Sequence, residues 1–412
     1  MNDAPATKSA SSIFILLTIF IDAIGFGLIM PVLPQLLMRV GQIKLSDAIG
    51  VGAWMGLAMA VASFISAPIL GNLSDRFGRR SVLLVSLAGL AVDYVLLAFA
   101  NTLPLVFLGR VVSGIFGGSY STAMAAISDI TSPDDRAKTF GFVSAAFGVG
   151  FVLGPAIGGL LGEYGDRAPF IVAAAMAGLN FLYGLIMFPE TLKPENRRPF
   201  SLSRANPLGA LKVVRALPGM ASVAVVLILW QIASLVYPMT WSFYGIAQFG
   251  WSTRLIGLSL AAVGITIAIS QIFITGPVVK RFGERDAATI GLIVAIAGFI
   301  VYALINQTWM AFAAMAFIAL QGLVQPSLMA MLSRRATADT QGEVQGISAM
   351  ALGLGSIVAP LVLTTPMAYF TSADAPVYFP GAPYLIAAGF GLVTLVLLRR
   401  LPRVAVASDA QM

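Results

Sequence analysis

The sequence predicts an all-α integral membrane protein of twelve transmembrane helices, arranged as two pseudo-symmetric six-helix bundles. The first observation is composition: of 412 residues, 58% are hydrophobic and 10% are charged, whereas a soluble domain is about 25% charged. The second is that the apolar runs are long and continuous, and roughly 20 apolar residues let one helix cross a bilayer. The third is that short motifs repeat in the two halves of the chain.

Twelve apolar spans can be placed, and a transmembrane barrel is excluded because its segments would be short and alternating. The predicted spans cover residues 12–38, 48–70, 81–100, 104–127, 139–162, 168–188, 218–245, 254–279, 286–306, 308–332, 342–368 and 381–401. The first span is predicted to be a retained helix and not a cleaved signal. One long polar interruption is rich in proline and basic residues. We therefore predict an N-terminal bundle over residues 1–188, a cytoplasmic linker over 189–217 and a C-terminal bundle over 218–412.

The two halves share motifs at a constant offset of 205 residues. The stretch Gly71–Arg80 (GNLSDRFGRR) recurs as Gly276–Arg285 (GPVVKRFGER). Glycines and a proline of GVGFVLGP recur at the same offset in GLGSIVAP. Because each half has an even number of spans, both halves enter the membrane from the same side. This pattern predicts parallel repeats with a binding cavity between them near the membrane midplane.

The distribution of basic residues predicts the orientation. A net charge of +7 would suggest nucleic-acid binding in a soluble protein, but in a membrane protein it follows from the positive-inside rule. With both termini inside, 20 of the 25 Lys and Arg residues fall in cytoplasmic segments and four fall outside. We predict a multi-pass protein of a bacterial inner membrane, with both termini cytoplasmic, surrounded by lipid and without a nucleic-acid partner.

Several kinds of chemistry are excluded by missing residue types. The sequence has no cysteine and no histidine, which excludes disulfides, thiol chemistry and most zinc or haem ligation. It has no G-x-x-x-x-G-K-[ST] phosphate loop and no soluble region long enough for a catalytic domain. We predict a protein that is not an enzyme, holds no metal or cofactor, and takes its energy from an ion gradient. Proton transfer would fall to Asp and Glu side chains.

Three ionisable residues lie inside the predicted spans: Asp22, Asp93 and Arg110. At about 1.5 Å per residue, all three fall in the middle third of the membrane. A charge at this depth costs at least ~2.5–3.5 kcal/mol on insertion scales, so each should face a cavity or a partner. One interpretation is a static ion pair that fixes helix packing. The interpretation we favour is proton coupling, in which a carboxylate in a low-dielectric cavity changes protonation as substrate arrives.

The loop between the second and third spans, GNLSDRFGRR, carries the most specific local signal. A glycine permits a tight turn there, and Asp75 could cap the partially positive N-terminus of another helix. Arg79 could reach Asp129 at the inner end of the fourth span. We interpret the segment as a gating loop, with determination of topology as the alternative. Its residues are Gly71, Asp75, Arg76, Gly78, Arg79 and Arg80, together with Asp129.

The fifth span contains six small or helix-bending residues, and the second half supplies polar and aromatic ones. The small residues of the fifth span allow close helix contact. Ordinary packing explains most of this pattern, and a hinge or seal between the bundles is the additional hypothesis. They are Gly148, Gly150, Gly154, Pro155, Gly158 and Gly159. In the second half no acid lies within a predicted span away from its ends, and the nearest is Glu343 at the start of the eleventh. The candidate residues there suit either an apolar substrate cavity or helix–helix contact. They are Gln231, Tyr237, Trp241, Gln271 and Gln325.

Together these motifs resemble the major facilitator superfamily, specifically its twelve-span drug:proton antiporters. GNLSDRFGRR is similar to the superfamily signature between the second and third helices, LGRVVSGIFGG to the fourth-helix arginine motif, and GVGFVLGPAIGG to the fifth-helix antiporter motif. DAIGFGLIMPVLPQLL, VDYVLLAFA and QGEVQG are most similar to the tetracycline efflux proteins. The resemblance covers nearly the whole chain. It implies that Asp22 and Asp93 are acids needed for transport, and that Asp75 and Arg79 belong to the gating loop.

The resemblance implies a proton-coupled secondary antiporter, expected to be monomeric, that exports small amphipathic drugs, tetracycline-like or multidrug, by alternating access. Tetracycline exporters carry a His in the eighth span and an Asp in the ninth, where this chain has Ile267 and Ala295. The motif for export therefore stands and the substrate is left open. The alternatives are a sugar or metabolite facilitator or symporter of the same fold, and a receptor or scaffold that does not transport.

Overall fold

A computed structural model describes residues 5–132, 134–202, 205–209, 220–335 and 341–401, and this part of the chain is helical and without strands. The helices of the first half are α1 (Pro5–Ile29), α2 (Leu33–Gly41), α3 (Leu45–Phe77), α4 (Arg79–Phe99), α5 (Leu103–Phe116), α6 (Ser119–Ile130), α7 (Arg136–Leu161) and α8 (Ala168–Met187). The linker contains the short turn η1 (Pro194–Asn196). The helices of the second half are α10 (Met220–Ser234), α11 (Val236–Phe249), α12 (Thr253–Ile269), η2 (Ser270–Thr275), α13 (Gly276–Leu304), α14 (Thr308–Ala313), α15 (Met315–Gln321), α16 (Val324–Ser333), α17 (Gln341–Ala359), η4 (Pro360–Thr364), α18 (Thr365–Phe370) and α19 (Ala382–Arg400).

Eleven apolar segments among the described residues are long enough to cross a membrane. One of them, Thr253–Leu304, has 52 residues, and as one helix it would measure roughly 78 Å against a hydrocarbon core of ~30 Å. Its backbone leaves the helical conformation at Gly283, with φ 78° and ψ 165°. Because this segment makes two crossings, the structure agrees with the twelve predicted spans.

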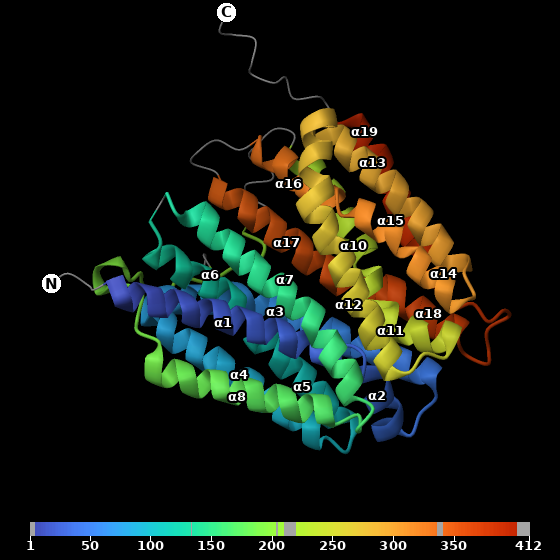
Figure 1. The fold of residues 1–412 in the computed structure, drawn as a ribbon, viewed down its shortest axis with the longest axis horizontal. Coiled ribbons are helices and arrows are strands. Elements are labelled where there is room, and N and C mark those ends of the chain that lie inside the picture. Colours follow the sequence, from blue (N-terminus) through green and yellow to red (C-terminus); the bar gives the residue numbers. More distant parts are fainter. Residues whose placement is uncertain (1–4, 133, 203–204, 210–219, 336–340, 402–412) are drawn as a thin grey trace, which may run out of the picture.

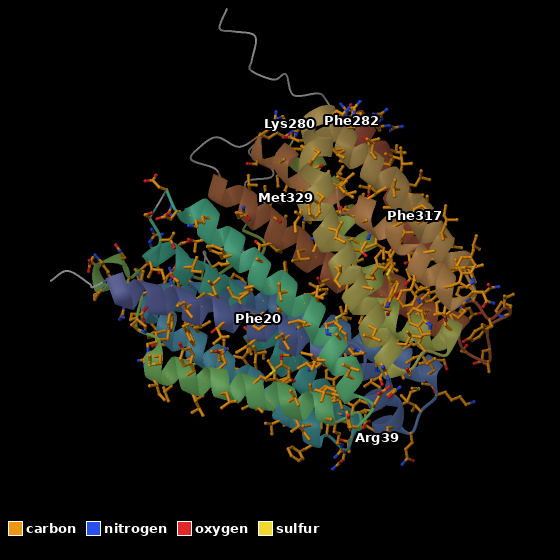
Figure 2. All side chains as sticks on the ribbon, viewed as in Figure 1. Phe20, Arg39, Lys280, Phe282, Phe317 and Met329 are labelled. Carbon is orange, nitrogen blue, oxygen red and sulfur yellow. The ribbon has the colours of Figure 1, made fainter. Side chains whose placement is uncertain are left out.

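The helices of each half pack mainly on one another, as Figure 1 shows in blue to green for the first half and yellow to red for the second. In the first half α1 packs on α7, α3 on α5 and α4 on α8; in the second half α10 and α13 pack on α19. The halves meet where α7 packs on α12, and where α3 packs on α17 and α18. Figure 2 places Arg39 and Lys280 at opposite ends of the molecule, and the predicted orientation assigns these ends to opposite membrane faces.

Several spans are interrupted at glycine or proline. The fourth span divides into α5 and α6 at Gly117 and Gly118, and the eleventh passes into the π-helical turn η4 at Pro360. Glycine lacks a side chain to pack and proline lacks a backbone donor, so both weaken a regular helix. All three of these residues border the central cavity, which shows that the irregular backbone lies where the chain surrounds open space.

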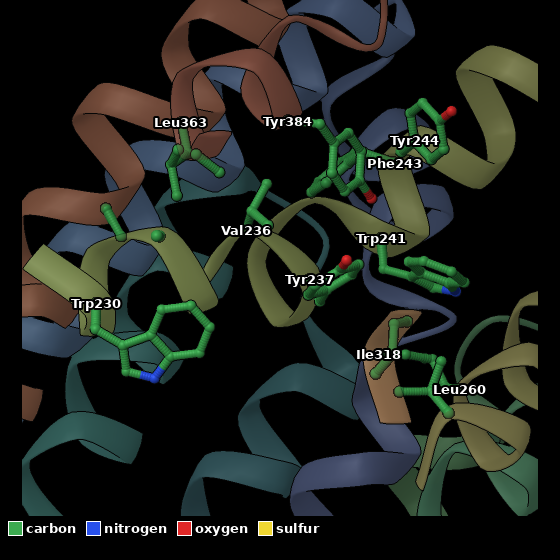
Figure 3. Packing of buried hydrophobic residues seen from close by; sticks show 14 of the residues in the cluster. Trp230, Val236, Tyr237, Trp241, Phe243, Tyr244, Leu260, Ile318, Leu363 and Tyr384 are labelled. Atoms are coloured by element: carbon green, nitrogen blue, oxygen red, sulfur yellow. The ribbon is translucent and has the colours of Figure 1, made fainter. Parts of the chain in front are cut away.

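The second bundle is built on a buried aromatic core (Figure 3). Tyr237 lies with its ring centroid 5.9 Å from that of Trp241, 5.6 Å from that of Tyr302 and 5.8 Å from that of Tyr384. Trp241 Nε1 donates a hydrogen bond to Ser259 Oγ at 2.8 Å. Because rings contact rings and the indole N–H is satisfied inside the bundle, this core forms a packed support behind the cavity wall.

Candidate functional site

A cavity of about 870 Å³ lies between the two bundles. Its wall comes from α1, α3, α5 and α6 on one side and from α11, α17 and η4 on the other. The methionine and aromatic side chains of the wall are Phe26, Met30, Met55, Met59, Phe64, Tyr120, Met239, Phe243 and Met350. Among the described residues, Arg110 is the charged side chain of this wall. Methionine and aromatic side chains adapt to apolar ligands of different shape, so the cavity suits small amphipathic molecules.

One end of the cavity is closed by contacts between the bundles. Ser242 Oγ, from α11, donates a hydrogen bond to the carbonyl of Met30 at 2.7 Å. Nearby, a Cβ atom placed on Gly52 would lie 2.9 Å from the ring of Phe243. The glycine therefore allows α3 and α11 to approach closely on this side.

At its other end the cavity extends toward the gating loop and the linker. The wall there includes Gly71, Asn206 and Pro207. The linker is attached to the end of α3, because the Arg198 N–H donates to the carbonyl of Asp75 at 3.0 Å. The linker therefore forms part of the cavity rim in addition to joining the bundles.

Asp93 and Arg110 form a buried ion pair at the cavity wall. Arg110 Nη2 lies 3.0 Å from Asp93 Oδ2 and 3.4 Å from Oδ1. The Asp93 side chain is fully buried and that of Arg110 is 7% exposed. Gly109 makes room for the carboxylate, since a Cβ atom there would lie 2.9 Å from Asp93 Oδ1. Separating such a pair would leave an uncompensated charge in low dielectric, so any separation has to be coupled to another charge or a proton.

Asp22 lies on α1, half-buried and one helical turn before Phe26. Residues four apart share a face of a helix, and both Phe26 and Met30 line the cavity. Asp22 is therefore on the cavity-facing side of α1, displaced toward the N-terminal end of that helix.

The sequence pattern did not single out Tyr94, the residue after Asp93 on α4. Its side chain is buried against α1, the helix that carries Asp22.

The predicted contact between Arg79 and Asp129 is present. Arg79 Nε lies 3.0 Å from Asp129 Oδ2, and Arg79 Nη1 lies 2.6 Å from Asp75 Oδ1 and donates to Ser74 Oγ at 2.6 Å. One guanidinium thus joins the ends of α3, α4 and α6. In this conformation the ion pair of Asp75 lies within the first bundle, and its capping of another helix stays a prediction.

The turn at Gly78 has a role that sequence analysis assigned only in part. Its φ is +98°, and a Cβ atom there would clash with the carboxylate of Glu190. Glu190 accepts hydrogen bonds from the backbone N–H groups of Arg79 at 2.8 Å and of Thr191 and Leu192 at 3.0 Å. A carboxylate at a helix N-terminus is favourable. Glu190 therefore anchors the start of the linker to the start of α4.

The remaining gating-loop residues lie around this network. The guanidinium of Arg76 lies 5.0 Å from the centre of the Phe77 ring, and Arg80 Nη2 donates to the carbonyl of Leu185 at 2.8 Å. Gly71 lines the cavity, and a Cβ atom placed on it would have no neighbour within 4 Å. Its hydrogen atom is therefore not a packing requirement in this conformation.

The glycines of α7 bring it against the backbone of α1. Cβ atoms placed on Gly150 and Gly154 would each lie 2.6 Å from a carbonyl oxygen of α1, those of Phe20 and Ile24 respectively. Gly158, one turn further, meets α1 in the same way. This spacing of four residues produces a continuous stripe of backbone contact.

The same helix also contacts the second bundle. A Cβ atom on Gly159 would lie 2.7 Å from the carbonyl oxygen of Thr253 at the start of α12. Pro155 lies against Gly27 of α1, where a Cβ atom would be 2.5 Å from the proline ring. Gly148 differs from the others, because a Cβ atom there would meet nothing within 4 Å. Five of the six predicted residues thus lie in close helix contacts and one does not.

The five candidate substrate-cavity residues of the second half lie outside the described cavity wall. In α11 the wall is formed instead by Pro238, Met239, Ser242 and Phe243, which lie on a different face of the helix from Tyr237 and Trp241. These two rings belong to the aromatic core. Of the remaining three, Gln231 lies in α10, Gln271 in η2 and Gln325 in α16. Gln271 donates a hydrogen bond to the carbonyl of Gly322 at 3.1 Å.

An ion pair of the second half occupies the positions equivalent to Arg79 and Asp129. Glu284 and Arg334, each 205 residues later, lie with Arg334 Nε 2.6 Å from Glu284 Oε1. The pair is retained with its charges exchanged. Sequence comparison of the two halves could have identified it, because both positions lie at the offset of the repeated motifs.

Comparison with known proteins places the chain in a family. The model of the Major Facilitator Superfamily matches residues 15–360 and 232–411. Tetracycline resistance protein class C of Escherichia coli is 42% identical over 395 residues, 95% of this chain and 98% of that protein. The class G protein of Vibrio anguillarum is 39% identical, with 95% and 98% covered. Multidrug resistance protein 2 of Bacillus subtilis is 27% identical, with 93% and 95% covered.

Solved structures agree with the fold. The human organic anion transporter MFSD10 has a TM-score of 0.70 at 23% identity, covering 96% of this chain and 100% of that one. The nucleoside transporter NupG has a TM-score of 0.77 at 14% identity, covering 95% of this chain and 98% of that one. With two six-helix bundles around a cavity and relatives matched over nearly their whole length, the chain belongs to the major facilitator superfamily.

Proposed function

We propose that this protein is a proton-coupled secondary antiporter that exports small amphipathic drugs, tetracycline-like or multidrug, by alternating access. The observation that carries this proposal is the buried pair of Asp93 and Arg110 at the wall of a large apolar cavity. Charged residues deep in the membrane are costly, and those that occur there mark pathways for substrates, ions or protons. Here its guanidinium reaches the cavity while its carboxylate does not.

The coupling follows from charge balance. Arg110 can leave Asp93 only when Asp93 takes up a proton or another negative group approaches the guanidinium. Asp22, on the cavity-facing side of α1, is the second acid available to exchange a proton. Occupation of the cavity by substrate changes the dielectric around both acids, and this links binding to protonation.

The position of the cavity supports an assignment of the conformation. The wall reaches the gating loop and the linker, which the positive-inside rule assigns to the cytoplasm, while the opposite end is closed by α3 and α11. We assign this conformation as inward-facing, ready to take substrate from the cytoplasm. By the same rule we expect both termini in the cytoplasm and the protein in a bacterial inner membrane.

The relatives support a drug as substrate, because relatives of 42%, 39% and 34% identity are tetracycline resistance proteins. By its resemblance to them the chain would act as a monomer, with the proton gradient as its energy source and no cofactor. We assign proton coupling to Asp22, Asp93 and Arg110, and gating to Asp75, Arg79 and Asp129.

Everted membrane vesicles test the proposal. Vesicles containing the protein should accumulate substrates from a panel of drugs, tetracycline included, when an imposed gradient makes their interior acidic. Accumulation should stop when nigericin removes the gradient. Flux that ignores the gradient would favour a facilitator, and the absence of flux across the whole panel would favour a receptor.

A further inference from the structure

We infer that the hydroxyl of Tyr94 is a positioning group that links the two membrane acids, Asp22 and Asp93. The inference rests on the proposed proton coupling and adds to it a residue that connects the two acids. Tyr94 lies on α4 and is 5% exposed. Its ring crosses from the helix that carries Asp93 to the helix that carries Asp22.

The geometry at Gly25 shows where the hydroxyl lies. A Cβ atom placed on Gly25 would be 2.5 Å from the Tyr94 hydroxyl oxygen and 3.1 Å from Cζ. The polar end of the ring therefore lies against the backbone of α1, three residues after Asp22. Any side chain larger than hydrogen at this position would displace it. Gly25 thus provides the space that lets the phenol extend to α1.

Three charged side chains lie within electrostatic range of this hydroxyl: Asp22 from α1, Asp93 from α4 and Arg110 from α5. Two are carboxylates, and Arg110 is bound to Asp93 at 3.0 Å. A tyrosine hydroxyl has one hydrogen to donate and also accepts hydrogen bonds. It can donate to an ionised carboxylate and accept from a protonated one, so its orientation depends on which acid carries the proton.

This arrangement gives the hydroxyl a function that a packing residue would not have. Donation to a carboxylate favours the ionised form, so the hydroxyl opposes protonation of whichever acid it serves. When that acid takes up a proton, the hydroxyl is released to serve the other. The hydroxyl thereby makes the protonation of each acid depend on the state of the other.

The variant Tyr94→Phe tests the inference because it keeps the ring and removes only the hydroxyl. Without this donor the acids hold their protons to higher pH, and the midpoint of the pH profile of proton-driven transport should move by about one unit to alkaline pH. Exchange of labelled for unlabelled substrate without a gradient should stay within twofold of wild type. Tyr183→Phe, on α8 and packed on Phe14, is the matched control and should leave the pH profile unchanged.

Gly25→Ala gives a second measurement, because it retains the hydroxyl but displaces it and should shift the pH profile in the same direction. It also keeps the inference testable if Tyr94→Phe does not insert. Unchanged profiles in the variants that insert, alongside loss of coupling in Asp22→Asn, would overturn the role of Tyr94 and leave the proposed function intact. Wild-type transport that ignores the pH gradient would instead overturn the proposed function.

Discussion

The two bundles share a backbone design but not a chemistry. Both turn at a glycine of positive φ, +98° at Gly78 and +78° at Gly283, and both place an ion pair beside that turn. The charges of the pair are exchanged, however, from Arg79 and Asp129 to Glu284 and Arg334. An ion pair depends on distance and opposite sign, not on which helix carries which sign, so the duplicated geometry could persist while the residues exchanged.

The bundles also differ inside the membrane. The first bundle holds Asp22, Asp93 and Arg110 within its spans, whereas aromatic rings fill the core of the second. The fifth span, in the first bundle, presents glycine to its neighbour. The residues equivalent to Gly154 and Gly158 in the second half are Ala359 and Leu363, both fully buried. The first bundle thus has the acids and the glycine stripe within its spans, and the second provides a packed aromatic core behind the opposite wall.

The largest expected effect comes from the acid of α1. Asp22→Asn should reduce proton-driven export to the level of vesicles without the protein, because the substitution removes the titrating group and keeps the helix. Expression should be unaffected. The control is Asp47→Asn, an exposed acid in the first turn of α3, which should export as wild type does. Export by Asp22→Asn under an imposed pH gradient would show that the first bundle does not depend on this acid.

The glycine stripe of α7 should give the next largest effect. Gly154→Ala places a methyl group against the Ile24 carbonyl and should destabilise the protein by about 1–3 kcal/mol, measured by thermal unfolding in detergent together with export. Gly148→Ala, where the new methyl group meets open space, should stay within about 0.5 kcal/mol of wild type. Equal stability of the two variants would mean that α7 can move away from α1 far enough to admit the methyl group, so that the glycine is not required for packing.

Exchanging charges in the first bundle tests whether the two ion pairs are equivalent. Arg79→Glu and Asp129→Arg should each impair export, and the double variant, which copies the second bundle, should recover part of it. We expect a coupling free energy of about 1–2 kcal/mol from the double-mutant cycle. Recovery should be incomplete because Arg79 also binds Asp75 and Ser74. A double variant more impaired than either single variant would show that the sign of this pair matters.

The loop acid should give a smaller effect that distinguishes the two turns. Asp75→Asn should shift the population toward inward-facing forms, because a latch that favours the outward-facing state loses a contact of ~1–2 kcal/mol. Labelling of cavity residues from the cytoplasmic side should then increase. Lys280→Gln changes the equivalent position of the second bundle and is the comparison variant. Unchanged labelling in Asp75→Asn would show that this acid contributes only to membrane topology.

Sequence alone identified the charged residues that are costly to place in a membrane. Asp22, Asp93 and Arg110 were recognisable because charges are rare in apolar spans, and the Arg79–Asp129 contact followed from their shared membrane depth. The side chains that line the cavity from the second half were not recognisable. Both faces of α11 are apolar or aromatic, so helical periodicity does not distinguish Met239, which lines the cavity, from Tyr237, which does not. Glu190 lies in a polar linker without a periodic pattern, so only the folded chain shows that it caps α4.

The smallest expected effect is that of magnesium, because we expect its removal to leave export unchanged. A magnesium–tetracycline chelate would call for oxygen ligands in the cavity, yet the described wall contributes no carboxylate and one cation, Arg110. The position where tetracycline exporters carry an Asp is Ala295, fully buried in the second bundle. Methionine and aromatic side chains suit a neutral or monocationic amphipathic molecule better. Export should therefore be the same with magnesium present or removed by EDTA, at a fixed pH gradient. Robust tetracycline export that falls when magnesium is removed would contradict this, and would show that Asp22 and the polar groups at the cavity rim can replace the ligands missing from the second bundle.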